Sequence, residues 1–136
     1  MDIELRKSSS RTRVFKTVFP GETNHYNTLY GGLALNWMDE IAFIAATRFS
    51  RQCYVTVSSD RVNFNVPIPA GTIVELDAYV SKIGKSSLEI TVDTYCEEMY
   101  SDKRTKSMTG VFTLVAIDEN RKSTPIKFPE PQQLGL

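Results

Sequence analysis

The fold is decided by residues 32–50, which read GLALNWMDEIAFIAATRFS. An apolar surface around most of a helix's circumference is typical of a helix that is buried. The spacing therefore predicts one long helix from Gly32 to about Ser50. Four polar side chains fall on one narrow stripe: Asn36, Glu40, Thr47 and, just after the helix, Arg51. We expect this stripe to face solvent or an edge of the structure.

Asp39 is an acidic side chain of the helix that lies outside the stripe. It lies about 60° away from the stripe, among neighbours that are small or apolar: Gly32, Leu35, Ala42, Phe43 and Ala46. Because small side chains let another backbone approach closely, we expect Asp39 to be partly buried. Such a carboxylate is a candidate general base. A lone aspartate in an apolar helix can also serve only to bridge backbone groups of a neighbouring element.

The rest of the chain predicts β-strands. Alternating apolar and polar residues begin at Thr12 and stop at Pro20 and Gly21, and further strands are predicted over residues 54–65, 73–83, 87–96 and 106–117. Residues 1–10 predict a loose leader. Residues 121–136 predict a loosely ordered tail, since the prolines at 125, 129 and 131 cannot extend a sheet.

The predicted order is one strand, one long helix and four strands in a meander. Antiparallel strands joined by short turns make a sheet with one apolar face, and the single apolar helix has to cover it. We therefore expect one α+β domain over residues 1–136, an antiparallel sheet wrapped around one central helix. One helix cannot cover such a sheet completely, so we expect a dimer that joins edges and buries the rest.

The composition excludes several classes of protein. Sixteen basic and sixteen acidic side chains cancel, so no global positive charge favours nucleic acid or an anionic membrane. The N-terminus is charged and lacks the apolar core of a signal peptide, and no stretch approaches the length of a membrane span. We expect a cytoplasmic protein. Cys53 and Cys96 fit neither a disulfide framework nor a metal site.

Familiar catalytic motifs are absent from the sequence. It has one histidine, His25, and no Gly-x-Ser-x-Gly elbow, phosphate loop, dinucleotide fingerprint or metal-ligand spacing. The remaining candidate segment is 24–32, NHYNTLYGG, followed by Asp39. Gly31 and Gly32 open the helix, where free backbone N–H groups and the helix dipole can stabilise an oxyanion. Two glycines there can equally mark a tight turn, and Asn24 offers an amide that can orient water or support the oxyanion.

An ordered set of segments spans about residues 14–125. It contains PGETNH (20–25), YGG (30–32), WMDE (37–40), VTV (55–57), DRVNF (60–64), PIPAG (67–71), GKSSLE (84–89) and FTLVAID (112–118). This set closely resembles the acyl-CoA hydrolase family of hotdog-fold thioesterases. The resemblance implies hydrolysis of acyl-CoA to a free acid and CoA, and hexamers built as trimers of dimers.

The resemblance also implies roles for particular residues. Asn24 of one chain and Asp39 of its neighbour would act together across a subunit interface. Asp39 would work as a general base or as a nucleophile, and both options stay open. The family usually has glycine where this chain has Asn27, and asparagine tolerates a left-handed backbone better than most residues.

Coenzyme A requires apolar walls for its pantetheine arm and basic groups for its phosphates. Candidates for the pantetheine amides are edge-strand residues that can pair with an added strand: Thr56, Val57 and Ser58. Candidates for the phosphates are a turn with hydroxyls and a cation, Gly84, Lys85, Ser86 and Ser87, and the cations Arg61 and Lys82. We expect no separate cofactor, because CoA enters as part of the substrate.

Two other functions remain open. A hydratase or dehydratase on the same fold would pair His25 with Asp39, and a non-catalytic acyl-CoA binding module would bind without releasing CoA. The sequence does not define which length or type of acyl chain the protein prefers. We expect its pocket to depend on which of four side chains line it: Trp37, Ile41, Phe64 and Met108.

Overall fold

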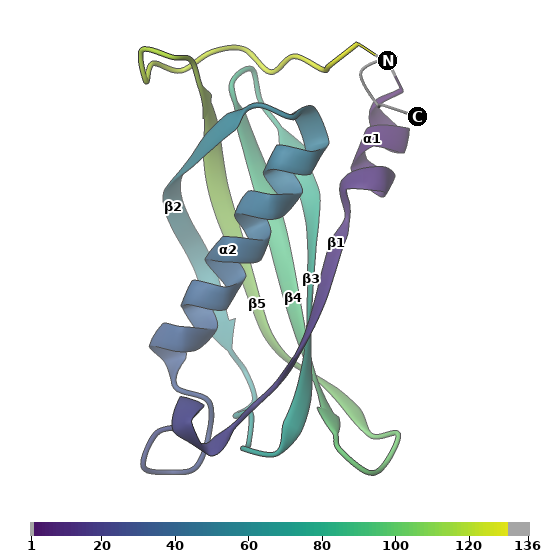
Figure 1. Ribbon diagram of the computed structural model, residues 1–136, viewed down its shortest axis with the longest axis vertical. Helices are drawn as coiled ribbons and strands as arrows, with labels where there is room; N and C mark the ends of the chain where they lie inside the picture. The colour runs from purple at the N-terminus through teal and green to yellow at the C-terminus, as the bar shows by residue number, and fades with distance from the viewer. Residues whose placement is uncertain (1, 131–136) are drawn as a thin grey trace.

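Five antiparallel strands form one sheet around a long helix in the computed structural model, which describes residues 2–130. The elements in chain order are α1 (Ile3–Ser10), β1 (Thr12–Thr17), η1 (Pro20–Glu22), α2 (Gly31–Ser50), β2 (Cys53–Phe64), β3 (Thr72–Ile83), β4 (Ser87–Glu98) and β5 (Arg104–Ile117). The strand order is β1-β3-β4-β5-β2, and α2 lies along the face around which the sheet curves (Figure 1). The predicted α+β arrangement, a sheet wrapped around one central helix, is confirmed.

The helix α2 buries the apolar face that its sequence predicted. The side chains of Met38, Ala42, Ala45, Ala46 and Phe49 are fully inaccessible to solvent. They pack against the inward-facing residues of the sheet, among them Val74, Leu76, Ala78, Leu88, Ile90, Val92 and Leu114. The helix ends at Arg51, whose left-handed backbone (φ 58°) lets its N–H reach the carbonyl oxygen of Thr47.

The predicted four-strand meander is wrong at one connection. Only β3, β4 and β5 follow one another as neighbours, while β2 pairs with β5 and β1 pairs with β3. Residues 65–71 join β2 to β3 and are too long and proline-rich for a tight hairpin turn, since proline lacks the N–H that a ladder needs. The N–H groups of Asn65 and Val66 instead donate to the carbonyl oxygen of Ser107 on β5. Both β1 and β2 are therefore edge strands.

The chain termini are more ordered than the sequence predicted. Residues 3–10, predicted as a loose leader, form α1 next to the end of α2 (Figure 1). The Arg6 guanidinium donates to the carbonyl oxygen of Phe49 at 2.9 and 2.6 Å. The last carbonyls of a helix have no partner within it, so this arginine both caps α2 and holds α1 in place.

The tail also differs from its prediction over residues 121–130. The N–H of Thr124 donates to the carbonyl oxygen of Ala116, and that of Ile126 donates to the carbonyl oxygen of Lys85. The ring of Phe128 packs edge-on against Phe49, with 5.2 Å between the centroids. Residues 131–136 of the predicted tail lie outside the described residues. Among residues 2–130, no helix has the length and apolar character needed to cross a bilayer.

Ion pairs join strands on the outer face of the sheet. Asp77 on β3 is 3% exposed and accepts two hydrogen bonds from the guanidinium of Arg11, while Arg13 lies 3.6 Å from the same carboxylate. Burial by itself would raise the pKa of Asp77. The hydrogen bonds and charges of the two arginines outweigh burial and hold the pKa of this carboxyl below its ordinary value.

We predict that Arg11→Ala lowers the free energy of unfolding at neutral pH by about 2 kcal/mol, because a buried carboxylate loses its charged hydrogen-bond donor. A lowered folded pKa contributes stability that is complete above the unfolded pKa and is lost as pH falls through the folded pKa. The difference between wild type and variant should therefore shrink as pH falls below 3.8, the ordinary value for this carboxyl.

Denaturant titrations across that pH range measure the effect. The matched control is Lys7→Ala, which removes an exposed ion pair to Glu4 of 3.5 Å and should change stability little at any pH. A stability difference for Arg11→Ala that does not depend on pH would contradict the assignment.

Candidate active site

A cleft opens between the first half of α2 and the strands β2 and β5. Its volume is about 440 Å³, and its lining combines polar and apolar side chains: Gly32, Leu35, Asn36, Asp39, Thr56, Ser59 and Phe112. Gly32, Asp39 and Thr56 were all predicted as site residues, and the tertiary structure brings these three together.

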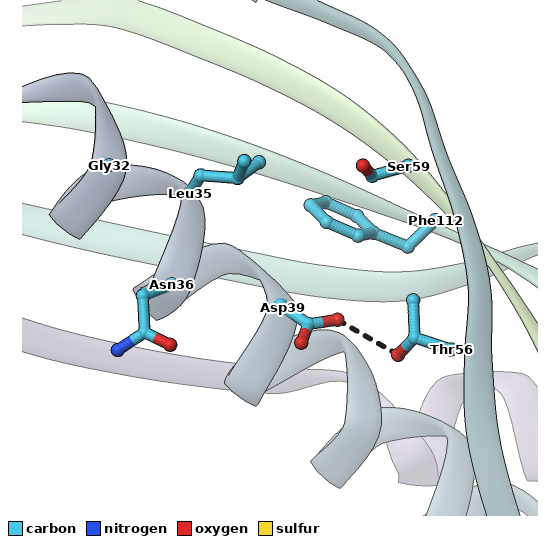
Figure 2. A pocket seen from close by; sticks show the side chains of 7 residues that line it. All are labelled: Gly32, Leu35, Asn36, Asp39, Thr56, Ser59 and Phe112. Carbon is cyan, nitrogen blue, oxygen red and sulfur yellow. Dashed lines mark hydrogen bonds between the residues drawn. The ribbon is translucent and has the colours of Figure 1, made fainter.

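Asp39 points from α2 across the cleft to β2 (Figure 2). Its Oδ1 accepts a hydrogen bond of 2.8 Å from the Thr56 hydroxyl, and its side chain is half-buried, as predicted. Thr56 was predicted as a contact for the pantetheine arm, and that contact stays a prediction; in the structure its hydroxyl donates to the Asp39 carboxylate. Because Thr56 holds one carboxylate oxygen, the Asp39 side chain keeps a defined orientation at the cleft that it lines.

A bulge in β2 decides which serine reaches the cleft. The register with β5 shifts between Thr56 and Ser58, which leaves Val57 without a partner residue. Side chains normally alternate between the two faces of a strand, and an extra residue reverses the alternation beyond it. Ser59 therefore shares the cleft with Thr56, whereas Ser58, predicted as an edge-strand contact for pantetheine, does not line it.

The start of α2 borders two cavities. The helix begins after Tyr30, which makes no side-chain cap, and within residues 2–130 the N–H groups of Gly31 and Gly32 have no acceptor. Gly32 lines the cleft that holds Asp39. Gly31 lines a separate cavity of about 230 Å³, otherwise bounded by Leu29, Phe64, Val66, Pro67, Ile68 and Met108. Free N–H donors with the positive end of the helix dipole suit a developing negative charge.

Asn24 lies in the loop before α2 and is not among the residues that line the cleft. Its Oδ1 accepts hydrogen bonds from the N–H of Tyr26 (2.9 Å), the N–H of Thr28 (3.3 Å) and the hydroxyl of Thr28 (3.2 Å). These bonds fold the loop into a tight turn and occupy the amide oxygen. The exposed amide nitrogen, a donor, is the part of Asn24 that remains available to another molecule.

Asn27, which stands where the family usually has glycine, adopts a left-handed backbone. Its φ is 63°, and its carbonyl oxygen accepts from the N–H of Ala70 at 3.1 Å. The loop path is therefore compatible with asparagine at this position. His25 lies next to Asn24, but its ring packs against Tyr26, with 3.9 Å between centroids, and it does not line the cleft with Asp39.

The predicted CoA-binding residues lie in three places. Val57 is exposed at the β2 bulge, next to Ser58. Arg61 and Lys82 lie on the outer face of the sheet, 2.7 and 3.7 Å from Glu89. The segment Gly84–Ser87 forms the β3–β4 turn, closed by the Gly84 N–H donating to the Ser87 carbonyl oxygen. Contact between any of these residues and CoA stays a prediction.

Sequence reasoning missed four residues of the cleft: Leu35, Asn36, Ser59 and Phe112. Asn36 was placed on the solvent stripe, and it is exposed as expected; its position one turn before Asp39 was the available signal. Ser59 had no such signal because the bulge is a tertiary feature. Within residues 2–130, no three His, Cys, Asp or Glu side chains cluster as metal ligands.

Comparisons with known proteins converge on one family. Residues 26–102 match the Thioesterase superfamily. An uncharacterized acyl-CoA thioester hydrolase of Bacillus subtilis is 39% identical over 134 residues, covering 97% of this chain and 78% of that protein.

Two solved structures show the same arrangement. An acyl-CoA hydrolase from Staphylococcus aureus, solved with butyryl coenzyme A, coenzyme A and coenzyme A disulfide, has a TM-score of 0.85 at 34% identity, covering 91% of this chain and 77% of that one. An apo hexameric acyl-CoA thioesterase has a TM-score of 0.86 at 34% identity, covering 93% and 81%. Alanine variants of the S. aureus enzyme at an asparagine, an aspartate and a threonine have also been solved.

We predict that Asn27→Gly keeps the thermal stability of the protein, because glycine adopts a positive φ without strain. Asn27→Val should lower the free energy of unfolding by about 1 to 2 kcal/mol, the cost of placing a β-branched residue in the left-handed region. Thermal denaturation of both variants measures this. Equal stability of the glycine and valine variants would show that the loop relaxes to another backbone path.

Proposed function

The chain belongs to the thioesterase superfamily, within its acyl-CoA hydrolases, and we propose that it hydrolyses acyl-CoA at sites shared by two subunits. The observation that carries the proposal is the Thr56–Asp39 hydrogen bond in an open cleft beside the start of α2. It combines an oriented carboxylate, room for water and substrate, and N–H donors near the same space. These are the elements that attack on a thioester carbonyl requires.

The spacing of three residues supports this assignment. In the S. aureus enzyme, the substituted aspartate follows the substituted asparagine by 15 residues, and the substituted threonine follows that aspartate by 17. Asn24, Asp39 and Thr56 have the same spacing in this chain. We propose that these three side chains form the reactive centre here, with Thr56 as a positioning residue that orients Asp39.

The positions of Asn24 and Asp39 support a site shared by two subunits. Asn24 does not line the cleft of its own chain, and its exposed amide nitrogen is free to reach a neighbour. The edge strand β2 borders the cleft and carries Val57, 57% exposed, while Phe43 on α2 is 45% exposed. Pairing two β2 edges would cover both apolar side chains. The hexameric neighbours support a dimer unit within a larger homo-oligomer.

The proposed chemistry needs only groups of the protein and water. Asp39 takes a proton from a water molecule, whose oxygen attacks the thioester carbonyl carbon. The N–H groups at the start of α2 and the amide N–H of the neighbour's Asn24 donate to the oxyanion, since the Asn24 oxygen is already occupied. The C–S bond then breaks, the CoA thiolate takes the proton from Asp39, and the free acid leaves. We propose no bound cofactor.

For the CoA phosphates we propose the β3–β4 turn rather than the outer face of the sheet. Arg61 and Lys82 both pair with Glu89, which neutralises part of their charge. Lys85 makes no ion pair within residues 2–130. Ser87 and Val55 both pair with Val115 of β5, so the turn lies two strand spacings, roughly 10 Å, from β2. The cytoplasmic location expected from the sequence stays a prediction.

We predict that Asp39→Asn reduces CoA release at least 10³-fold, because the amide cannot take the proton from water, while the fold and assembly are retained. A thiol-detecting assay with an acyl-CoA panel measures the rate. The matched control is His25→Ala, which should keep most of the activity. Loss of activity in His25→Ala would favour a dehydratase, and acyl-CoA binding by wild type without thiol release would favour a binding module.

A mixing experiment tests whether each site uses two subunits. Asp39→Asn and Asn24→Ala chains should each be nearly inactive alone. Co-refolded in equal amounts, they should recover about a quarter of wild-type activity, because that fraction of the sites combines an intact Asn24 with an intact Asp39 from the partner. Recovery no greater than the sum of the separate variants would show that both residues act within one chain.

A further inference from the structure

The first turn of α2 separates two cavities of different character. On one side of it, Gly32 lines the cleft with Asp39, Asn36, Thr56 and Ser59. On the other side, Gly31 lines the 230 Å³ cavity, in which every other lining side chain is apolar. The ring of Phe64 stands 3.8 Å from where a Cβ on Gly31 would lie. The N–H donors proposed to hold the oxyanion therefore lie at the boundary between a polar and an apolar space.

A thioester carbonyl has two substituents that leave it in different directions. One is the sulfur of the pantetheine arm, which is polar along its amides, and the other is the acyl chain, which is apolar. With the carbonyl oxygen at the start of α2 and the carbonyl carbon within reach of Asp39, the acyl chain gains most by entering the apolar cavity. Removing its methylene groups from water is favourable in proportion to the area buried.

We propose that the cavity lined by Gly31, Phe64, Val66, Ile68 and Met108 is the acyl-chain site and that Phe64 and Val66 limit the length of chain it accepts. This inference rests on the proposed thioesterase function. The cavity volume is about 230 Å³. At roughly 30 Å³ for each methylene group, close to the share of a water molecule in the liquid, it accommodates about eight carbons. The preferred substrates are therefore short to medium-chain acyl-CoAs.

Two of the residues expected to line the acyl pocket line neither cavity. Trp37 and Ile41, two of the four residues expected to line the pocket, are 8% and 3% exposed and belong to the core. Met108, 3% exposed, closes the inner end of the apolar cavity, whereas Phe64 and Val66, 54% and 40% exposed, stand at its mouth. The two exposed side chains are thus the ones that substitution can change without disturbing the core.

The test is the dependence of kcat/KM on acyl length, from acetyl- to palmitoyl-CoA, for the full-length oligomer. In wild type, kcat/KM should rise about fourfold for each added methylene and stop rising at about eight carbons. Phe64→Ala enlarges the mouth of the cavity and should move the optimum to longer chains. Val66→Phe fills it and should move the optimum to shorter chains. Phe15→Ala is the matched control, since Phe15 is similarly exposed (59%) on β1 and lines neither cavity.

The outcomes separate this inference from the proposed function. Opposite shifts of the optimum in Phe64→Ala and Val66→Phe, with none in Phe15→Ala, support the acyl site. Thiol release by wild type with an unchanged chain-length profile in both variants, or with the same shift in all three, would overturn it while leaving the thioesterase function intact. No thiol release from any acyl-CoA by wild type would overturn the proposed function itself, and the acyl site with it.

Discussion

The burial of one apolar helix against one face of one sheet is the constraint on which the rest of the molecule depends. Residues of α2 on its inner side, such as Met38 and Phe49, are fully inaccessible, and only a sheet that curves around the helix can remove that much surface from water. This packing sets the rotation of α2 about its axis. Asp39 then faces the gap between α2 and the edge strand β2, partly buried and open to ligand.

Irregularity in β2 decides which side chains line that gap. A regular strand would alternate strictly, and Thr56 and Ser58 would share one face. The bulge at Val57 interrupts the alternation, so that Thr56 holds the carboxylate while Ser59 lines the same cleft. Bulges often occur near active sites because they redirect a side chain without breaking the sheet. The orientation of Asp39 therefore depends on backbone geometry as well as on the identity of the residue.

The start of α2 contributes to the proposed site through its backbone N–H groups alone. An uncapped helix terminus is costly unless its N–H groups find acceptors in water or in a ligand. Gly31 and Gly32 leave these donors accessible on both sides of the helix. The same turn can thus hold an oxyanion and divide a polar cleft from an apolar cavity, which separates the reacting carbonyl from the group that distinguishes one substrate from another. In the proposed mechanism, the residues that carry out hydrolysis therefore differ from the residues that select the acyl-chain length.

Much of this molecule could be predicted from local pattern. The 3.6-residue periodicity of α2, the alternation in β1 and β3–β5, the half-buried Asp39 and the left-handed tolerance of Asn27 are all properties of short stretches of sequence. The resemblance carried by eight separate segments added the family, which the comparisons confirm. Helix α1 could not be predicted in the same way. Its short, polar segment has no apolar stripe, and the contact of Arg6 with Phe49 comes from 43 residues away.

The sequence by itself determined α2, the five strands and the family, because periodicity and motif are encoded locally. Only the tertiary structure decided that β2 joins β5 rather than β3, that the Thr56 hydroxyl donates to Asp39, that Ser59 lines the cleft, and that Asn24 lies outside the cleft of its own chain. Each of these depends on strand pairing and register between residues far apart in the chain. Such pairings are selected by the burial of the whole sheet and helix together, and no single stretch of sequence specifies them.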